Sequence, residues 1–237
     1  MAEPGKGETL RRVGGELVIV FVGVLLALAA DDFREARGER AEAQESLTLL
    51  LTDLAADSVD FASGANDAQR IASGAAWLAE NWARTTVPSD SLGALLYTFS
   101  TRTTLELNNS VYSGLQNANR LRLVEPASLR QALLGYYQVR QVGIRDWNED
   151  LSTIYARLML DELPGHVINL PGAERGTMWP PAESRVEIRT SWDDIRADAE
   201  LHNVVVQYGR LVEFFGGMLR RGEAEAGELM AIIREQL

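Results

Sequence analysis

The chain has 237 residues, enough for one large domain or for one domain with an appendage. Hydrophobic residues make up 46% and charged residues 24% of it, which excludes a disordered, a collagenous and a wholly membrane-embedded protein. The absence of cysteine excludes disulfides, a thiol nucleophile and thiolate metal sites. The formal net charge of −11 has the wrong sign for a nucleic-acid-binding protein, so we expect no nucleic acid partner.

The clearest feature is an unbroken apolar run near the start, residues 17–30 (LVIVFVGVLLALAA). Extended to residues 13–33, it would form a helix about 31 Å long, which matches the roughly 30 Å hydrocarbon core of a bilayer. A buried core helix usually keeps one polar stripe, whereas every face of this run is apolar. The sequence therefore predicts a transmembrane helix at 13–33 in contact with the lipid bilayer, preceded by a short tail at 1–12.

A cleaved signal peptide is the main alternative for this segment. It has a basic start, an apolar centre and small residues at 27–29 that resemble a cleavage site. We expect instead an uncleaved anchor. Lys and Arg are equally numerous on the two sides, so the positive-inside rule does not fix the orientation. Arg11 and Arg12 come before the run, whereas Asp31 and Asp32 come directly after it, which favours a cytoplasmic N-terminus and a periplasmic domain at 34–237, in a bacterial inner membrane.

The rest of the chain has the spacing of amphipathic helices. Residues 31–45 are charged on nearly every turn with both signs, which is typical of a solvated helix. Because no proline lies between Gly5 and Pro88, we expect the membrane helix to continue to about residue 63 and to break at 64–66. Apolar residues every three to four positions predict further helices at 67–84, 89–99, 110–118, 127–163, 191–219 and 223–237.

Two local motifs set the expected boundaries of the C-terminal helices. Ser191 with Asp194 has the spacing of a capping box, which begins a helix. The pair Gly216-Gly217 and Gly222 are expected to kink or end that helix before the last one. The predicted fold is all-α, with one N-terminal transmembrane helix that continues into an elongated helical bundle.

One proline-rich irregular loop, residues 164–190, interrupts the helical pattern and holds four of the seven prolines. Val186 and Ile188 alternate with charged neighbours, so a short strand or hairpin is one interpretation of this part. Met178 and Trp179 precede two prolines and form a candidate interface, because Trp is a common interface hot spot and proline reduces the entropy lost on docking. The alternative is that Trp179 covers the bundle's own core.

The anchor also carries a family resemblance, in the segments GELVIV, GVLLAL and DDFRE, which follow one another in residues 15–35. They resemble an uncharacterised family of bacterial single-span membrane proteins with a G-E-hydrophobic span, a G-[IV]-L-[IL]-A-L core and a paired Asn/Asp exit. Residues 47–57 and 112–137 look similar to later segments of that family. Phe33 stands where Trp is expected, and Asp-Asp where Asn-Asn is common. The resemblance implies a membrane anchor and a helical extramembrane domain, and implies no activity, ligand or catalytic residue.

Residues with catalytic or metal-binding potential form no recognised motif. His166 and His202 lack the spacing of metal ligands, and we expect His166 to face solvent and His202 to be an ordinary helix residue. Acidic pairs such as Asp193-Asp194 are neighbours on exposed helices, whereas catalytic carboxylates need opposed environments. We therefore predict no enzyme activity, no cofactor and no metal.

The aromatic residues on the apolar stripes are expected in the core: Trp77, Trp82, Tyr136, Tyr137 and Trp147.

Small residues in the predicted span form a second candidate interface. Gly23 and Ala27 form a small-x-x-x-small pair, with Ala30 three residues further on, and such a face lets another transmembrane helix approach closely. The alternative is that these residues have no packing role, since alanine and glycine are common in membrane helices. The leading functional hypothesis is a non-catalytic accessory or structural subunit that docks on other membrane-protein subunits. An energy-transducing complex, respiratory or of the photosynthetic reaction-centre and light-harvesting kind, is one candidate, although no pigment or haem ligand motif supports it. A ligand-binding sensor domain that acts through a separate partner is the alternative, and a membrane-tethered enzyme is disfavoured for want of residues.

Overall fold

The structure is a computed structural model that describes residues 6–100, 105, 107–169 and 186–237. The side chains of residues 6–20, 89, 90, 100, 141, 168, 169 and 186 are not among those described. The predicted all-α class is confirmed. The elements in chain order are α1 (Lys6–Asn81), α2 (Ser89–Ser100), α3 (Ser110–Asn117), the 3₁₀ turn η1 (Leu121–Leu123), α4 (Ala127–Leu134), the π-helix η2 (Gly135–Arg140), α5 (Gln141–Arg157), the π-helix η3 (Leu158–Glu162), the 3₁₀ turn η4 (Leu163–Gly165), β1 (Val167–Asn169), β2 (Val186–Ile188), α6 (Trp192–Ala197) and α7 (Ala199–Gln236).

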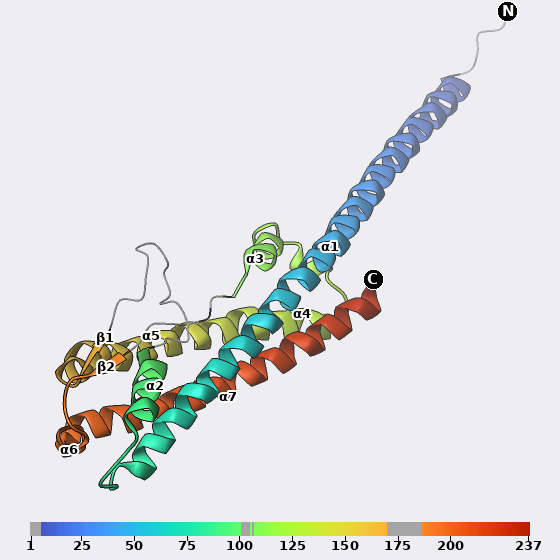
Figure 1. The fold of residues 1–237 in the computed structure, drawn as a ribbon. Helices are drawn as coiled ribbons and strands as arrows, with labels where there is room; N and C mark the ends of the chain where they lie inside the picture. Colours follow the sequence, from blue (N-terminus) through green and yellow to red (C-terminus); the bar gives the residue numbers. More distant parts are fainter. Residues whose placement is uncertain (1–5, 101–104, 106, 170–185) are drawn as a thin grey trace, which may run out of the picture.

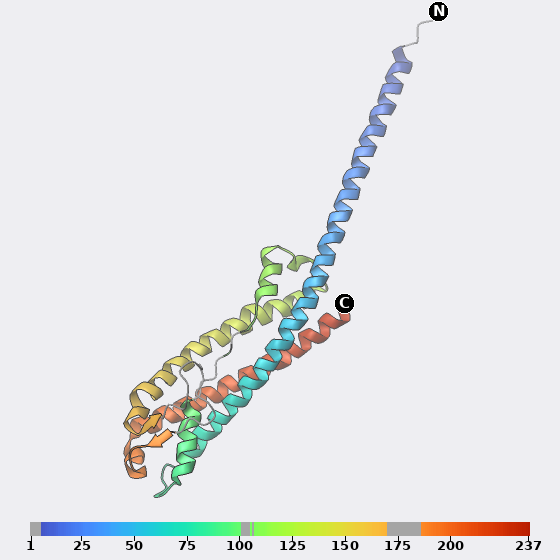
Figure 2. The same cartoon turned by 45° about the horizontal axis from the view of Figure 1, so that its top comes forward.

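The dominant element is α1, a single helix of 76 residues that is about 114 Å long. Its C-terminal half lies in a bundle with α7 and the α4–η2–α5 run, whereas its N-terminal half protrudes alone (Figure 1). The protruding half stays clear of the bundle after rotation (Figure 2), apart from the contact of its last turns with the segment around η1. Among the side chains of α1 that the structure describes, from Phe21 onward, the first buried one is that of Ala43, and the bundle begins there.

Antiparallel packing of α1 on α7 forms the core of the bundle. Each helix buries one residue every three or four positions in a regular 3-4 spacing, the pattern of a coiled coil. On α1 these positions are Leu47, Leu50, Leu54, Asp57, Phe61, Gly64, Ala68, Ile71, Ala75 and Leu78. On α7 they are Leu201, Val205, Tyr208, Val212, Phe215, Leu219, Gly222, Ala226, Leu229 and Ile233.

Glycines on α7 bring the two backbones unusually close. A Cβ added at Gly209 would lie 2.4 Å from the Cβ of Ala75, and one added at Gly222 would lie 2.5 Å from the ring of Phe61. The predicted break at 64–66 and the predicted kink or end at Gly216-Gly217 and Gly222 are therefore wrong. Both helices run straight through these positions, because the packing that a small residue permits outweighs its helix propensity cost of about 1 kcal/mol.

The predicted helix 127–163 is confirmed as a helical run with two π-helical segments. Pro126 is the N-cap residue, and α4, η2, α5 and η3 follow without an intervening loop. A π-helix widens the helix locally and is frequent at functional sites. This observation directs attention to the first of these segments, η2, which lies against α1 and α7.

The end of the bundle away from the protruding helix is closed by α2, α6 and a two-stranded hairpin (Figure 1). β1 and β2 pair antiparallel, with Val167 opposite Ile188, which confirms the predicted hairpin within 164–190. The capping box of Ser191 and Asp194 is present. The helix that it begins ends at Ala197, and Asp198 then caps α7, so the predicted helix 191–219 is in fact two.

The predicted transmembrane helix falls in the protruding half of α1. In the part of the chain whose side chains the structure describes, no helix contains a stretch both long and apolar enough to cross a membrane. The predicted span at 13–33 lies only partly in that part, since the side chains of residues 13–20 are outside it. Its whole backbone is helical, whereas residues 1–5 of the predicted tail lie outside the described residues. The transmembrane helix stays a prediction.

Candidate functional site

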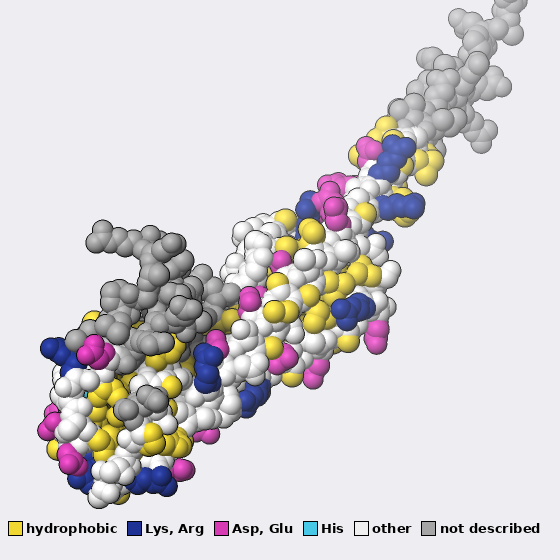
Figure 3. Space-filling view, in the orientation of Figure 1, with side chains coloured by type: hydrophobic (Ala, Val, Ile, Leu, Met, Phe, Trp, Pro, Cys, Tyr) yellow, Lys and Arg dark blue, Asp and Glu magenta, His cyan; other side chains and the backbone are white. Residues whose placement is uncertain are grey.

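The protruding half of α1 exposes an apolar surface. Phe21, Leu26 and Phe33 are 61%, 66% and 66% exposed, and the apolar residues between them are also uncovered. Figure 3 shows hydrophobic side chains along this segment with none of the bundle over them. Isolated exposed apolar side chains are normal, but a helix that is apolar on every face needs an environment that covers it.

The predicted interface residues of the span lie on this uncovered segment. Gly23, Ala27 and Ala30 are exposed, and a Cβ added at Gly23 would meet no atom within 4 Å. The structure therefore leaves room for a helix to approach this face. The other predicted interface residues, Met178 and Trp179, lie outside the described residues.

Where α1 enters the bundle, its charged surface pairs with η1. Arg122 contacts Glu39 at 2.9 Å, and Arg120 pairs with Glu42. The solvated helix predicted at 31–45 is confirmed, and these two ion pairs connect it to the segment after α3. Exposed ion pairs of this kind contribute little to the free energy of folding. Their role is therefore to orient α1 relative to η1 and not to stabilise the bundle.

A buried carboxylate lies at the centre of the bundle. Asp57 occupies one of the buried coiled-coil positions of α1, and its Oδ2 accepts a hydrogen bond of 2.8 Å from the Tyr136 hydroxyl. Its Oδ1 accepts a bond of 3.3 Å from the backbone N–H of Asn108. One turn earlier, Asp53 accepts a bond of 3.0 Å from the Asn108 side-chain amide. The Asn108 side-chain oxygen also accepts a hydrogen bond from the backbone N–H of Ser110 at the start of α3.

Two further tyrosines surround this carboxylate. Tyr137, next to Tyr136 in η2, stacks on Tyr112 with ring centroids 4.4 Å apart. The Tyr137 hydroxyl is buried and has no hydrogen-bond partner among the described residues. We name Asp53, Asp57 and these three tyrosines the polar cluster. Because the π-helix turns two consecutive tyrosines inward, α1 and η2 are fixed in register by a polar contact inside an apolar core.

Burial sets the protonation behaviour of the polar cluster. Desolvation raises the pKa of Asp57, against the hydrogen bonds from Tyr136 and Asn108 that lower it. Desolvation and the Asp57 charge also raise the pKa values of Tyr136 and Tyr137, so both hydroxyls stay protonated. Neither tyrosine can then act as a base or an anionic nucleophile. Through the hydrogen bond between Tyr136 and Asp57, the cluster joins η2 to α1.

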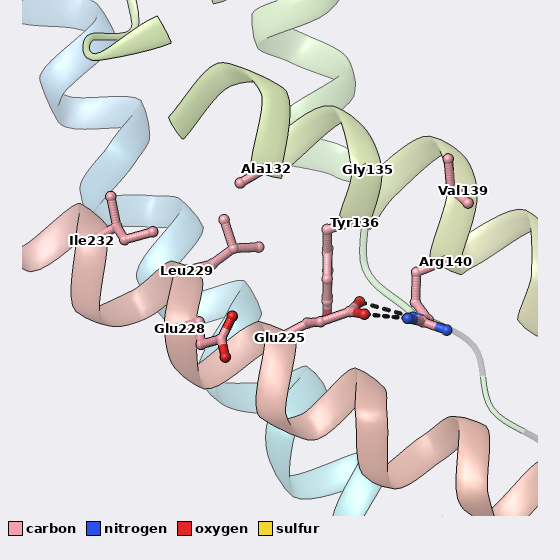
Figure 4. Close-up of a pocket in the computed structure, with 9 residues that line it drawn as sticks. All are labelled: Ala132, Gly135, Tyr136, Val139, Arg140, Glu225, Glu228, Leu229 and Ile232. Carbon is pink, nitrogen blue, oxygen red and sulfur yellow. Dashed lines mark hydrogen bonds and ion pairs between the residues drawn. The ribbon is translucent and has the colours of Figure 1, made fainter. Parts of the chain in front are cut away.

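A groove lies on the outer side of the polar cluster, between η2 and α7. Figure 4 shows Tyr136 behind it, Ala132 and Val139 on one wall and Leu229 and Ile232 on the other. Its volume is about 380 Å³, and two carboxylates of α7 and one guanidinium also line it. We name it the η2–α7 groove. Asp57 is not among its lining residues, so a molecule in the groove would meet the tyrosine and not the carboxylate.

The structure corrects the expectation for His166. This residue is buried, with Nε2 at 2.9 Å from Asp198 and Nδ1 at 3.0 Å from the Thr190 hydroxyl. It therefore ties the hairpin to the start of α7 and does not face solvent. His202 lies at an aromatic contact, with its ring 4.6 Å from that of Trp82, as an ordinary partly buried residue.

The predicted aromatic core is confirmed for all five residues. Tyr136 and Tyr137 are buried, and Trp77, Trp82 and Trp147 are partly buried against the core. The described part of the chain contains no group of three or more His, Cys, Asp or Glu residues arranged to hold a metal ion.

Comparison with known proteins finds no family model, no curated protein and no solved structure that matches this chain. The resemblance to a family of single-span membrane proteins therefore stays a prediction. The features of the structure that bear on function are the uncovered helix, the polar cluster and the groove.

Asp57 was not predicted as a functional residue, although the sequence contains a signal for it. Leu47, Leu50, Leu54 and Phe61 follow a 3-4 spacing in which position 57 is the next core position, and that position carries an aspartate. A carboxylate at a core position needs a hydrogen-bond partner, so the pattern predicts a buried polar contact. The partner, Tyr136, is 79 positions away and could not be identified from spacing alone.

Proposed function

We propose that the chain is a non-catalytic, membrane-anchored accessory subunit. The N-terminal half of α1 crosses the bilayer and docks on other membrane-protein subunits, and the bundle extends from the membrane as a rigid arm. The supporting observation is the contrast within one helix, because the apolar residues from Phe21 to Phe33 are exposed, whereas a regular stripe of apolar residues from Leu47 onward is buried. The wholly apolar run at 17–30 and the family resemblance support the same proposal.

The partner is proposed to contact the small face of Gly23, Ala27 and Ala30, where close helix approach is open. Met178 and Trp179 are the proposed second contact. Such a subunit fits an energy-transducing assembly, respiratory or photosynthetic, and needs no cofactor of its own. We propose an inner-membrane location, with the N-terminus cytoplasmic and the bundle periplasmic.

The proposal is tested by purifying the tagged full chain from native membranes in mild detergent and identifying the proteins that accompany it. We expect the chain to stay in membranes after an alkaline carbonate wash and to be recovered with other membrane subunits. Release by the wash would contradict the anchor, and recovery of a lone monomer would contradict the subunit role.

A matched pair of variants separates the docking face from the anchor. Gly23→Leu with Ala27→Leu keeps the segment apolar but adds bulk to the small face, so insertion should persist and recovery of the partner should fall. Val22→Leu with Leu26→Phe adds bulk at the same spacing on a neighbouring face and should leave recovery unchanged. Equal recovery from both variants would remove the small face as the contact.

A ligand-binding sensor is the second candidate function. The η2–α7 groove is the observation that favours it, since ligand sites occur between the helices of bundles. A sensor of this kind would transmit its signal through a separate partner.

A further inference from the structure

We propose that the η2–α7 groove binds a small organic cation, a molecule with an ammonium or amidinium group on an apolar body of about one ring. This proposal concerns the bundle and does not depend on the membrane anchor.

The shape of the groove favours a small molecule. Its volume of about 380 Å³ lies in the range of about 300–1,000 Å³ that is typical of ligand sites. Its walls are mostly aliphatic, with Ala132 and Val139 facing Leu229 and Ile232 (Figure 4). An apolar body in this space would be covered from both sides.

The back wall of the groove is preformed. Tyr136 is buried, and its hydroxyl is fixed by the hydrogen bond of 2.8 Å to Asp57. A side chain held in this way loses no further freedom when a ligand binds, which favours binding of a small molecule.

Gly135 lines the groove without a side chain. A Cβ added at this position would meet no atom within 4 Å, so a larger side chain has open space at the groove wall.

The charges that line the groove select the sign of the ligand. Arg140 binds Glu225 through two hydrogen bonds, one of 2.9 Å from its Nε, so these two charges neutralise each other. Glu228 lies one turn further along α7, is exposed and has no ion-pair partner among the described residues. The groove therefore has one uncompensated negative charge beside an apolar surface, which favours a cation and disfavours an anion.

The test is calorimetric titration of the full chain, in a non-ionic detergent, with 2-phenylethylammonium and separately with phenylacetate. These probes share one ring and differ in the sign of their charge. We expect saturable binding of the cation and binding of the anion that is weaker by about tenfold or more. Glu228→Gln should weaken binding of the cation by about tenfold, whereas Glu235→Gln, an exposed position near the end of α7, should not change it.

A second pair of variants tests the location. Gly135→Leu should abolish binding of the cation by filling the groove, because its side chain has room to fit without disturbing the bundle. Gly227→Leu adds the same side chain to α7, also into open space, at a position that does not line the groove, and should leave binding intact.

Four results would overturn the proposal. They are the absence of cation binding, equal binding of the two probes, cation binding that survives Gly135→Leu, and a change of oligomeric state in Gly135→Leu measured by light scattering. The last result would mean that a second copy of the chain fills the groove.

Discussion

The two halves of α1 contain the same kinds of side chain in opposite environments. Phe33 is 66% exposed in the protruding half, whereas Phe61 is completely buried in the packed half. The difference lies in the pattern of the neighbours. Around Phe61 the apolar residues form one stripe, and α7 supplies a matching stripe.

In the protruding half, apolar residues occupy every face between Phe21 and Ala30. A helix of a three-helix bundle can cover one stripe of a neighbour and not its whole circumference. The contrast shows that apolar residues arranged in one periodic stripe pack against another helix of the same chain. Apolar residues on every face of a helix need cover from outside the chain.

The largest effect on stability is expected when a phenylalanine in each half of α1 is replaced by alanine and the two variants are compared. Phe61→Ala should lower the free energy of unfolding of the bundle by about 3–5 kcal/mol, because it leaves a cavity against α7 and Tyr136. Phe33→Ala should change it by less than about 0.5 kcal/mol. Urea denaturation in detergent, followed by circular dichroism, measures both, and a similar loss for the two variants would contradict the division of α1 at Ala43.

A smaller effect is expected from the glycines that permit close packing in the bundle. Gly209→Ala places a methyl group 2.4 Å from that of Ala75, so the helices must separate, at a cost of about 1–3 kcal/mol. Gly227→Ala has open space and should stabilise α7 by about 0.5–1 kcal/mol through helix propensity. Thermal melting compares them, and stabilisation by both substitutions would show that close approach of α1 and α7 is not required.

The next effect on stability is expected at the N-cap of α7. This cap stabilises the bundle at the end away from the protruding helix. Asp198→Ala removes the cap bonds to Glu200 and Leu201 and the contact with His166, at a cost of about 1–2 kcal/mol. Asp193→Ala, at a more exposed position of α6, should cost much less. A comparable loss in the two variants would contradict the capping role.

The same cap predicts a pH dependence. The hydrogen bond from His166, and then the backbone N–H of Leu201, lower the pKa of Asp198. Its contribution to stability is therefore present above the ordinary aspartate pKa of about 3.9 and is lost as the pH falls through its lower folded-state pKa. Acid denaturation of the native chain should show this loss of stability, whereas acid denaturation of the Asp198→Ala variant should not.

The smallest effect, and one of opposite sign, is expected at Asp57. Burial raises its pKa, so the folded state binds its proton more tightly than the unfolded state. Its contribution to stability is present below the ordinary aspartate pKa of about 3.9 and is lost as the pH rises through its raised folded-state pKa. Asp57→Asn keeps the shape and removes this dependence, so it should gain stability relative to the native chain as the pH rises above about 4. The exposed Asp60→Asn should not, and parallel pH profiles of native and Asp57→Asn chains would contradict a buried ionisable Asp57.

Much of the fold could be predicted from periodicity and local motifs. The leucines of α1, the long run from 127 to 163 and the capping box at Ser191 all carry their signals within a few residues. The continuity of α1 through Gly64 could not be predicted in this way. The packing on α7 that outweighs its low helix propensity comes from residues far along the chain.

The candidate sites differ in the same way, because features with a local signal could be predicted and features that depend on distant residues could not. The uncovered apolar segment and its small residues were identified from the sequence, because their signal is local. The burial of His166 depends on Thr190 and Asp198, which the hairpin brings to it from 24 and 32 positions away. The η2–α7 groove depends on a π-helix, for which the apolar spacing has no distinct signal.

Because the chain has no native cysteine, single-cysteine labelling can test the proposed membrane segment. Leu26 and Leu49 lie on the same helix and are 66% and 52% exposed, so the structure alone gives their cysteine variants similar reactivity. In intact membranes, a membrane-impermeant maleimide should label Leu49→Cys from the side of the bundle and leave Leu26→Cys unlabelled, and detergent should make both reactive. Equal labelling of the two variants before detergent is added would show that the protruding half of α1 is not in the bilayer.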